Sequence, residues 1–221
     1  MNAETGTKIS LRTPQLDLMS REIVTSLAAL VRLLDDHGSM VVHVTASRHG
    51  EGTTTVAREL AAAAARSRWC KVALLEADRP AEGDPLAIAA PAIGLLESYG
   101  ETAAPAPLRR LRIGDAEVGV GTLASAVPMT PKVDSVRGFY NWIRANYTLA
   151  IVDCPPVQEA GDSAVMAPIA DGTILVVEAE KTRIAEIKRA RDTLEMWGAS
   201  LIGTVLNKQR DRSPRFLRRM F

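Results

Sequence analysis

The stretch that decides the fold is "MVVHVTASRHGEGTTTVARELAAAAA", residues 40–65. Residues 40–47 form a short run rich in β-branched side chains, which predicts a buried strand. The alanine-rich part from Thr54 to Ser67 predicts a helix. Between them, Gly50 and Gly52 stand beside a run of hydroxyl residues. A strand, a glycine-rich loop and a helix in this order are typical of a phosphate-binding loop, because backbone N–H groups and a helix N-terminus then face an anion together.

The same alternation continues along the chain. Further apolar runs predict strands at 71–77, 147–156, 172–179 and 201–208. Amphipathic patterns predict helices after Ser20 and at 133–145, 161–170 and 182–197. Apolar strands that alternate with amphipathic helices indicate a mostly parallel sheet covered on both faces. The sequence therefore predicts an α/β fold, a three-layer sandwich, in which ligands bind at the carboxyl ends of the strands.

The length and composition favour one domain. The 221 residues are 47% hydrophobic, enough for one large core. We expect a mobile arm at 1–15, the domain at 16–208 and a basic tail at 209–221. Residues 80–110, rich in Pro, Ala and Gly, predict a long surface excursion. The tail carries five arginines, which are either solvated or dock to an anionic membrane surface or an acidic partner.

Charge and cysteine content exclude some classes of protein. Lys and Arg number 27 against 26 Asp and Glu, so no overall basic field favours nucleic acid as a partner. The two cysteines, Cys70 and Cys154, have no metal-site spacing and fit a reducing compartment. No run approaches the roughly 18 apolar residues that span a bilayer. We therefore expect a cytoplasmic protein whose membrane contact, if any, is peripheral and made through a partner.

The loop lacks the residue that usually carries its charge. Against the pattern G-x-x-x-x-G-K-[ST], the first glycine is Ser47, the lysine is Thr53 and the Mg²⁺-binding hydroxyl is Thr54. A charge-assisted hydrogen bond contributes about 1.5 to 3 kcal/mol, so its loss weakens phosphate binding roughly tenfold to a hundredfold. Turnover should fall further, because the transition state places more charge on the phosphoryl oxygens. Arg48 or Lys181 can in principle replace the charge; a purely structural turn is the alternative interpretation of the glycines.

Acidic side chains at the neighbouring strand ends favour the nucleotide site over a mere turn. Glu76 and Asp78 end the second strand, and Asp153 follows the apolar residues 149–152. An aspartate in this place is suited to hold Mg²⁺ or its waters. Cys154, beside Asp153, has no identifiable base and is interpreted as structural.

Six segments, in order, resemble one known family, the bacterial tyrosine kinases that work with polysaccharide co-polymerases in capsule and exopolysaccharide synthesis, a branch of the deviant Walker P-loop ATPases. The resemblance covers about residues 20–208. The segments are "VTASRHGEGTTTVARELA", "KVALLEADRP", "GLLESYG", "YTLAIVDCPPV", "ADGTILVVEAEKTR" and "IGTVLNK".

The resemblance implies a P-loop NTPase-like fold that binds ATP or ADP with Mg²⁺. It implies that the nucleotide-binding residues are Gly50, Glu51, Gly52, Thr53, Thr54, Thr55 and Asn207, the last reading the adenine edge. It implies metal contacts from Thr54, Asp78 and Asp153, and it makes Asp78, Asp153 and Glu76 the candidate catalytic residues.

Several departures from the family bear on catalysis and assembly. Thr53 occupies the position of the family's lysine, and Glu76 occupies that of its usual aspartate. The tail has no tyrosine, since the three tyrosines are Tyr99, Tyr140 and Tyr147. The family joins its subunits into a ring through the pattern E-x-x-R-x-x-R. Here Glu22 matches, but Thr25 and Ala28 occupy the two arginine positions, which leaves homo-oligomer formation open.

These observations favour a tyrosine-kinase-like P-loop protein, impaired in catalysis, that regulates a membrane polysaccharide co-polymerase by protein contact and binds nucleotide weakly. The alternative is an active ATPase or protein-tyrosine kinase that acts on a partner. A partition or septum-positioning ATPase ranks lower, because the loop and the "VDCPPV" segment resemble the polysaccharide branch more closely.

Overall fold

The computed structural model describes residues 10–11, 21–66, 70–77, 108–113, 116–123, 132–159 and 161–209. Within them, eight strands form one sheet in the order β1-β4-β5-β3-β6-β2-β7-β8. All neighbours are parallel except β4 and β5. The strands are β1 (Ser10–Leu11), β2 (Met40–Ala46), β3 (Val72–Glu76), β4 (Arg109–Ile113), β5 (Ala116–Thr122), β6 (Leu149–Asp153), β7 (Gly172–Glu178) and β8 (Leu201–Asn207).

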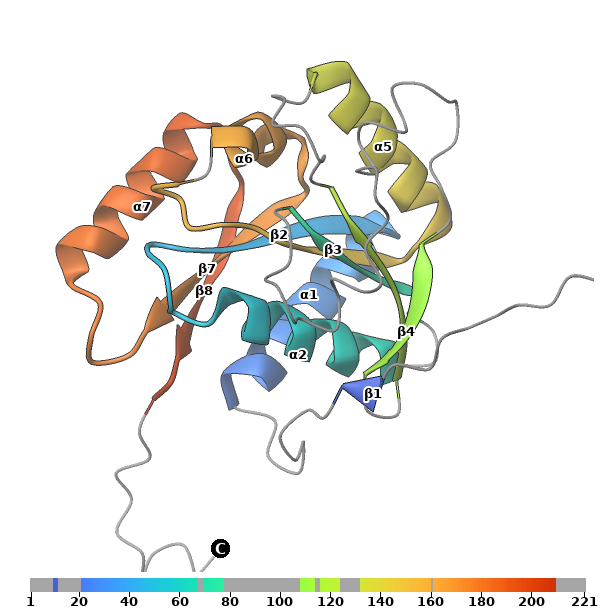
Figure 1. Ribbon diagram of the computed structural model, residues 1–221, viewed down its shortest axis with the longest axis horizontal. Helices are drawn as coiled ribbons and strands as arrows, with labels where there is room; N and C mark the ends of the chain where they lie inside the picture. Colours follow the sequence, from blue (N-terminus) through green and yellow to red (C-terminus); the bar gives the residue numbers. More distant parts are fainter. Residues whose placement is uncertain are drawn as a thin grey trace, which may run out of the picture.

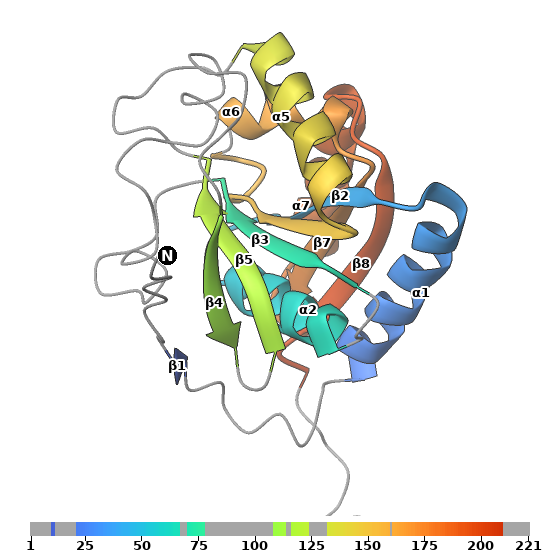
Figure 2. The ribbon, with the colours of Figure 1, turned by 90° about the vertical axis from the view of Figure 1, so that its right-hand side faces the viewer.

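Helices cover both faces of this sheet, as Figures 1 and 2 show. On one face lie α1 (Arg21–His37) and α2 (Thr53–Arg66). On the other lie α5 (Val133–Asn146), α6 (Gly161–Met166) with the 3₁₀ turn η2 (Ala167–Ile169), and α7 (Ile184–Met196). The predicted α/β, three-layer sandwich with a mostly parallel sheet is confirmed.

The strand before the phosphate loop lies in the middle of the sheet. β2 pairs with β6 on one side and β7 on the other, and all seven of its residues are buried. A strand covered on both faces needs apolar side chains in both directions, which explains its continuous apolar run. The loop that follows β2 therefore starts from a buried strand that is paired on both sides.

The alanine-rich helix α2 packs closely on the sheet. Its residues 60–64 are all buried, and Leu60 has no exposed surface. Small side chains allow a helix to approach the strands closely, while Leu60 fills the space beneath it. On the same face of the sheet, α1 contributes Ile23, Leu30 and Leu34 to this core.

Three strands were not predicted from the sequence: the two-residue β1, and β4 and β5. β4 and β5 form the antiparallel pair, and β5 alternates between buried and more exposed residues. This period-two pattern at 116–122 is the signal that sequence reasoning missed. The predicted excursion at 80–110 extends into β4 at Arg109; its residues 80–107 lie outside the described residues.

The predicted terminal segments are only partly described. Ser10 and Leu11, inside the predicted arm, pair with Arg112 and Ile113 of β4, so this part of the arm joins the sheet. The rest of 1–15 lies outside the described residues, as does the basic tail from residue 210 onward.

Truncation of Leu60 should test the packing of α2. Leu60→Ala removes a fully buried side chain, so the free energy of unfolding should fall by about 2 to 5 kcal/mol. Met196→Ala, at a residue that is 77% exposed, is the control and should change it by less than about 0.5 kcal/mol. Urea denaturation measures both, and equal effects would contradict the packing described here.

Candidate functional site

The phosphate loop runs from Ser47 to Gly52, between the carboxyl end of β2 and the first residue of α2. Two glycines shape it. Gly50 has φ +80° and Gly52 has φ +96°, the left-handed region that side chains disfavour. A Cβ atom at Gly52 would also lie 2.2 Å from Asn207 Nδ2, whereas one at Gly50 would meet nothing within 4 Å. Glycine is thus favoured at position 50 by the backbone conformation alone. At position 52 it is favoured both by the conformation and by the lack of space for a side chain beside Asn207.

The start of α2 offers backbone N–H donors and has no acidic side chain. Its first hydrogen bond runs from Val56 N to Gly52 O at 3.0 Å. Within the described part of the chain, no acceptor is recorded for the N–H groups of Thr53, Thr54 and Thr55. The first turn contains no acidic residue. These N–H groups and the positive end of the helix are suited to an anion, so the phosphate site stays a prediction that the geometry allows.

A buried carboxylate holds the loop in shape. Glu51 has no exposed surface. Its Oε2 accepts hydrogen bonds from Ser47 N at 2.8 Å, Ser47 Oγ at 2.9 Å and Arg48 N at 3.2 Å. Thr182, in the connection from β7 to α7, donates a hydrogen bond to Oε1. The Glu51 side chain therefore points into the protein and stabilises the loop from inside.

The end of β8 borders the loop on one side. Asn207 Nδ2 donates a hydrogen bond to Glu51 O at 2.8 Å, and Lys208 Nζ donates one to Gly50 O. The predicted nucleotide contact Asn207 is thus next to the loop, with its amide nitrogen bound to it. The contact from Lys208 was not predicted from the sequence, because 158 residues separate Lys208 from Gly50.

The acidic residues lie on the other side. β6 pairs with both β2 and β3, so that Asp153 faces Val44 in one register and Glu76 in the other. Ala77 N donates a hydrogen bond to Asp153 O at 2.9 Å, which holds these strand ends together. The structure thus brings Glu76 and Asp153 together near the loop, as predicted; Asp78 lies outside the described residues.

Glu76 is engaged by a basic residue of α2. Arg58 Nη2 donates a hydrogen bond to Glu76 Oε1 at 3.1 Å, and both side chains are largely buried, with 21% and 10% exposed. Arg58 is four residues after Thr54, so it lies one helical turn further along the same face. The charge of this predicted catalytic carboxylate is therefore balanced by a guanidinium.

The two cations suggested as replacements for the lysine are also paired. Arg48 Nε lies 3.7 Å from Glu51 Oε1, and Arg48 Nη1 lies 4.0 Å from Glu186 on α7. Lys181 Nζ lies 3.2 Å from Glu178 Oε1. Neither contact directs the cation to the N–H groups at the start of α2.

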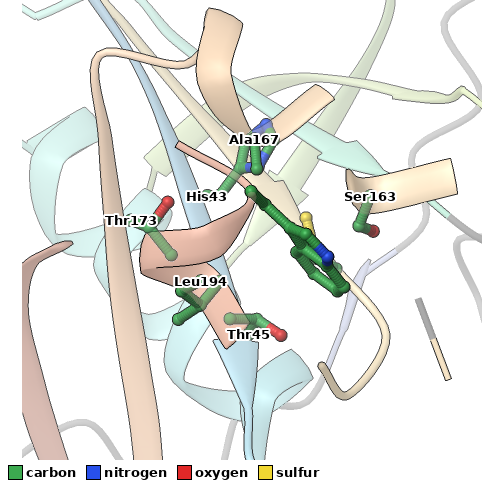
Figure 3. A pocket seen from close by; sticks show the side chains of 8 residues that line it. His43, Thr45, Ser163, Ala167, Thr173 and Leu194 are labelled. Carbon is green, nitrogen blue, oxygen red and sulfur yellow. The ribbon is translucent and has the colours of Figure 1, made fainter. Parts of the chain in front are cut away.

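Apart from the loop, the structure contains a small, mostly apolar cavity between the sheet and the α6–α7 side of the protein (Figure 3). Its lining includes Ser163 of α6 and Thr173 of β7, both buried; among the described residues, Thr173 has no hydrogen-bond partner for its hydroxyl group, and Ser163 has only the Cys154 thiol nearby. Figure 3 shows these two side chains on opposite sides of the cavity, with His43 also at its wall. The cavity has room for about one water molecule, and no residue of the phosphate loop lines it.

Burial changes the titration of two groups beside this cavity. Burial lowers the pKa of His43 to about 4, against an opposing effect of Asp171, and its Nε2 lies 2.7 Å from the Tyr140 hydroxyl. Burial, with a smaller contribution from Asp153, raises the pKa of the Cys154 thiol far above its usual range. A thiol that stays protonated is a poor nucleophile, which favours the structural interpretation of Cys154.

Two features are absent from the part of the chain that the structure describes. No helix there is both long and apolar enough to cross a membrane. No group of three or more His, Cys, Asp and Glu side chains in that part of the chain is arranged to hold a metal ion.

Known proteins with similar sequences are bacterial tyrosine kinases. No protein-family model matches the chain. Over 179 residues it is 24% identical to the tyrosine-protein kinase CpsD of Streptococcus agalactiae, covering 76% of the chain and 75% of that relative. Over 69 residues it is 35% identical to Staphylococcus aureus CapB, provisionally named a tyrosine-protein kinase; that match spans 31% of the chain and only 30% of CapB. The resemblance inferred from the motifs is confirmed.

Solved structures share the fold. The kinase domain of the Escherichia coli tyrosine kinase ETK has a TM-score of 0.64 and 23% identity, covering 86% of this chain and 79% of that one. The chimerical protein CapA2B2 has a TM-score of 0.67 and 21% identity, covering 90% and 88%. Cobyrinic acid a,c-diamide synthase of Mycobacterium smegmatis, with bound ADP and magnesium, has a TM-score of 0.51 and 16% identity, covering 75% and 73%. The fold is P-loop NTPase-like.

The two loop glycines give a matched pair of variants. Gly50→Ala adds only the cost of a left-handed side chain, about 1 kcal/mol. Gly52→Ala adds the same cost and a clash with Asn207, so it should lower the free energy of unfolding further. In urea denaturation, Asn207→Ala should recover part of the difference when combined with Gly52→Ala. An equal loss for both single variants would contradict the close approach at Gly52.

The stability of the protein should depend on the protonation of His43. Its folded pKa of about 4 lies below the ordinary value of 6.5, so between these values the unfolded chain binds a proton that the folded chain does not. The His43 contribution is present above pH 6.5 and is lost as the pH falls to about 4. His43→Gln should remove this part of the pH dependence of unfolding. His37→Gln, at an exposed residue, should retain it; a wild-type slope in His43→Gln would contradict the burial of a neutral imidazole.

Proposed function

We propose that this protein is a tyrosine-kinase-like, P-loop regulator of exopolysaccharide or capsular polysaccharide biosynthesis that binds ADP or ATP weakly and turns it over slowly. The observation that carries the proposal is the glycine loop whose following helix offers unpaired N–H groups, within the described residues, beside Asp153. A magnesium nucleotide matches this arrangement: its phosphates accept hydrogen bonds from backbone donors, and its metal binds hydroxyl and carboxylate oxygens.

The residues on the two sides of the loop support separate roles in nucleotide binding. Thr54, at the start of α2, and Asp153, at the end of β6, would hold Mg²⁺ or its waters, together with Asp78. Gly50, Gly52 and Thr55 would contact the phosphates through the loop and helix. Asn207 would meet the base at the β8 side. The similar fold of the Mycobacterium smegmatis enzyme with ADP and magnesium supports this assignment by analogy.

Weak turnover is supported by the charges at the site. Thr53 provides no cation where the resembling family has lysine, and the transition state for phosphoryl transfer needs more positive charge than the bound nucleotide does. The ion pair with Arg58 also holds one oxygen of Glu76 against α2, away from a metal. Both features weaken catalysis more than binding.

The tyrosines support regulation rather than self-phosphorylation. Tyr140 is fully buried, and its hydroxyl lies 2.7 Å from His43. Tyr147 is partly buried and packs in the core cluster of α5. Neither residue is placed as a phosphate acceptor, and Tyr99 lies outside the described residues. A protein of this kind would act by contact with a partner.

The partner we propose is a membrane polysaccharide co-polymerase, a chain-length determinant protein, bound from the cytoplasmic side. The curated relatives CpsD and CapB support this choice as members of the resembling kinase branch. Membrane contact would then be peripheral, through that partner and at the inner membrane. Thr25 and Ala28, in place of the arginines of the ring-forming pattern, weaken the case for a homo-oligomeric ring.

Nucleotide binding and hydrolysis by the purified protein test the proposal. Isothermal titration with ADP and Mg²⁺ should give weak binding that Thr53→Lys strengthens roughly tenfold or more, because the ammonium adds a charge-assisted hydrogen bond. Hydrolysis of ATP should be slow in the wild type and faster in Thr53→Lys. Asp153→Ala should weaken the dependence on Mg²⁺ in both backgrounds.

Two other results would change the assignment. Rapid ATP turnover or phosphorylation of a partner by the wild type, abolished by Asp153→Ala, would favour the active-enzyme alternative. Binding of neither ADP nor ATP at millimolar concentration would contradict a nucleotide site and leave a scaffold. Met196→Ala, at a residue of α7 that is 77% exposed, is the control for both measurements.

A further inference from the structure

The phosphate loop has a cation beside it that comes from another part of the chain. Thr53 leaves the loop itself without the usual ammonium group, yet Lys208 Nζ donates a hydrogen bond to the carbonyl oxygen of Gly50. Gly50 lies three residues before Thr53. The end of β8 thus brings an ammonium group directly to the loop, from which the local sequence has lost one.

The backbone after β8 holds Lys208 in this place. Lys208 has φ +57°, a left-handed turn, and its N–H donates a hydrogen bond to Asn207 Oδ1 at 2.8 Å. The same Asn207 side chain donates to Glu51 O at 2.8 Å. Asn207 therefore bridges the loop and the Lys208 backbone, so that the lysine stem lies across the loop; its Cε would be 3.8 Å from a Cβ built at Gly52.

The ammonium group can still move a short distance. The Lys208 side chain is 46% exposed, and its second contact is at 3.5 Å, with Glu178 Oε2. Glu178 also pairs with Lys181 at 3.2 Å, so its charge remains balanced if Lys208 moves away. A neutral carbonyl is a weaker acceptor than a phosphate oxygen, and charge-assisted hydrogen bonds to an anion are the stronger ones.

We propose that Lys208 supplies the phosphate-binding cation that Thr53 does not, by turning its ammonium group from Gly50 O to the phosphates of a nucleotide held in the loop. This inference rests on the proposed nucleotide site. Lys208 is then a binding residue, and its charge neutralises the phosphates from the β8 side instead of from within the loop.

Other cations near the loop fit this role less well. Arg48 lies on the buried carboxylate of Glu51 and on Glu186, which are fixed by α7 and the loop interior. Lys181 contacts Glu178, and no contact between Lys181 and the loop is recorded in the described residues. Only for Lys208, among these three, does the structure record a side-chain hydrogen bond to a loop carbonyl group.

The test is nucleotide affinity in the full chain with the charge of Lys208 removed. Lys208→Gln should weaken the binding of ADP with Mg²⁺ about tenfold or more, as expected for one charge-assisted contact, and should leave adenosine binding within twofold because adenosine has no phosphate. Lys208→Arg should retain most of the affinity. Lys188→Gln, an exposed lysine on α7, is the matched control and should change nothing.

A double-variant cycle tests the replacement itself. If the ammonium of Lys208 substitutes for the lysine absent at Thr53, the Thr53→Lys background should reduce the effect of Lys208→Gln to about threefold or less. Full additivity of the two changes would contradict substitution, as would a loss of adenosine binding equal to the loss of ADP binding, which would indicate packing against the base.

The outcomes separate this inference from the proposed function. If the wild type binds ADP and Lys208→Gln binds it with the same affinity within twofold, the inference alone is overturned. If Lys181→Gln loses affinity for ADP instead, the phosphate-binding cation is Lys181. A wild type that binds neither ADP nor inorganic tripolyphosphate at millimolar concentration overturns both. Urea denaturation of Lys208→Gln establishes that the variant is folded, as expected for an exposed side chain.

Discussion

The buried carboxylate of Glu51 is the interaction on which the candidate site depends. A carboxylate without exposed surface is stable only with hydrogen bonds, and Glu51 receives them from the start of the loop and from Thr182. These bonds fix the loop against the β7–α7 connection. With its side chain inside, the loop directs the N–H groups that begin α2 outward, toward an incoming anion.

The order of the strands places different chemical groups on the two sides of the loop. Because β2 lies between β6 and β7, the acids at the ends of β3 and β6 are on one side, and the amide and ammonium groups at the end of β8 are on the other. A magnesium nucleotide needs both kinds of group, carboxylates for the metal and donors for the phosphates and base. Arg58 pairs with Glu76 on the acidic side, and Thr53 adds no charge to the loop.

Local patterns were sufficient for most of the fold. The buried strand at β2, the alanine-rich helix and the later alternation were predicted because burial on two faces imposes apolar runs and helices impose their own periodicity. The β4–β5 pair was missed, since the alternation in β5 is short and contains two glycines, Gly119 and Gly121. The positions of Glu76 and Asp153 at adjacent strand ends were predicted from the parallel sheet alone.

By itself, then, the sequence determined the layered α/β fold, the glycine-rich loop between a buried strand and a helix, and the presence of Thr53 where such loops have lysine. Only the tertiary structure decided that Glu51 faces inward, that Glu76 pairs with Arg58, and that Lys208 reaches Gly50. The physical reason is the range of each effect. Periodicity reports burial over a few neighbouring residues, whereas these contacts join segments as far as 158 residues apart, which only the order of the strands brings together.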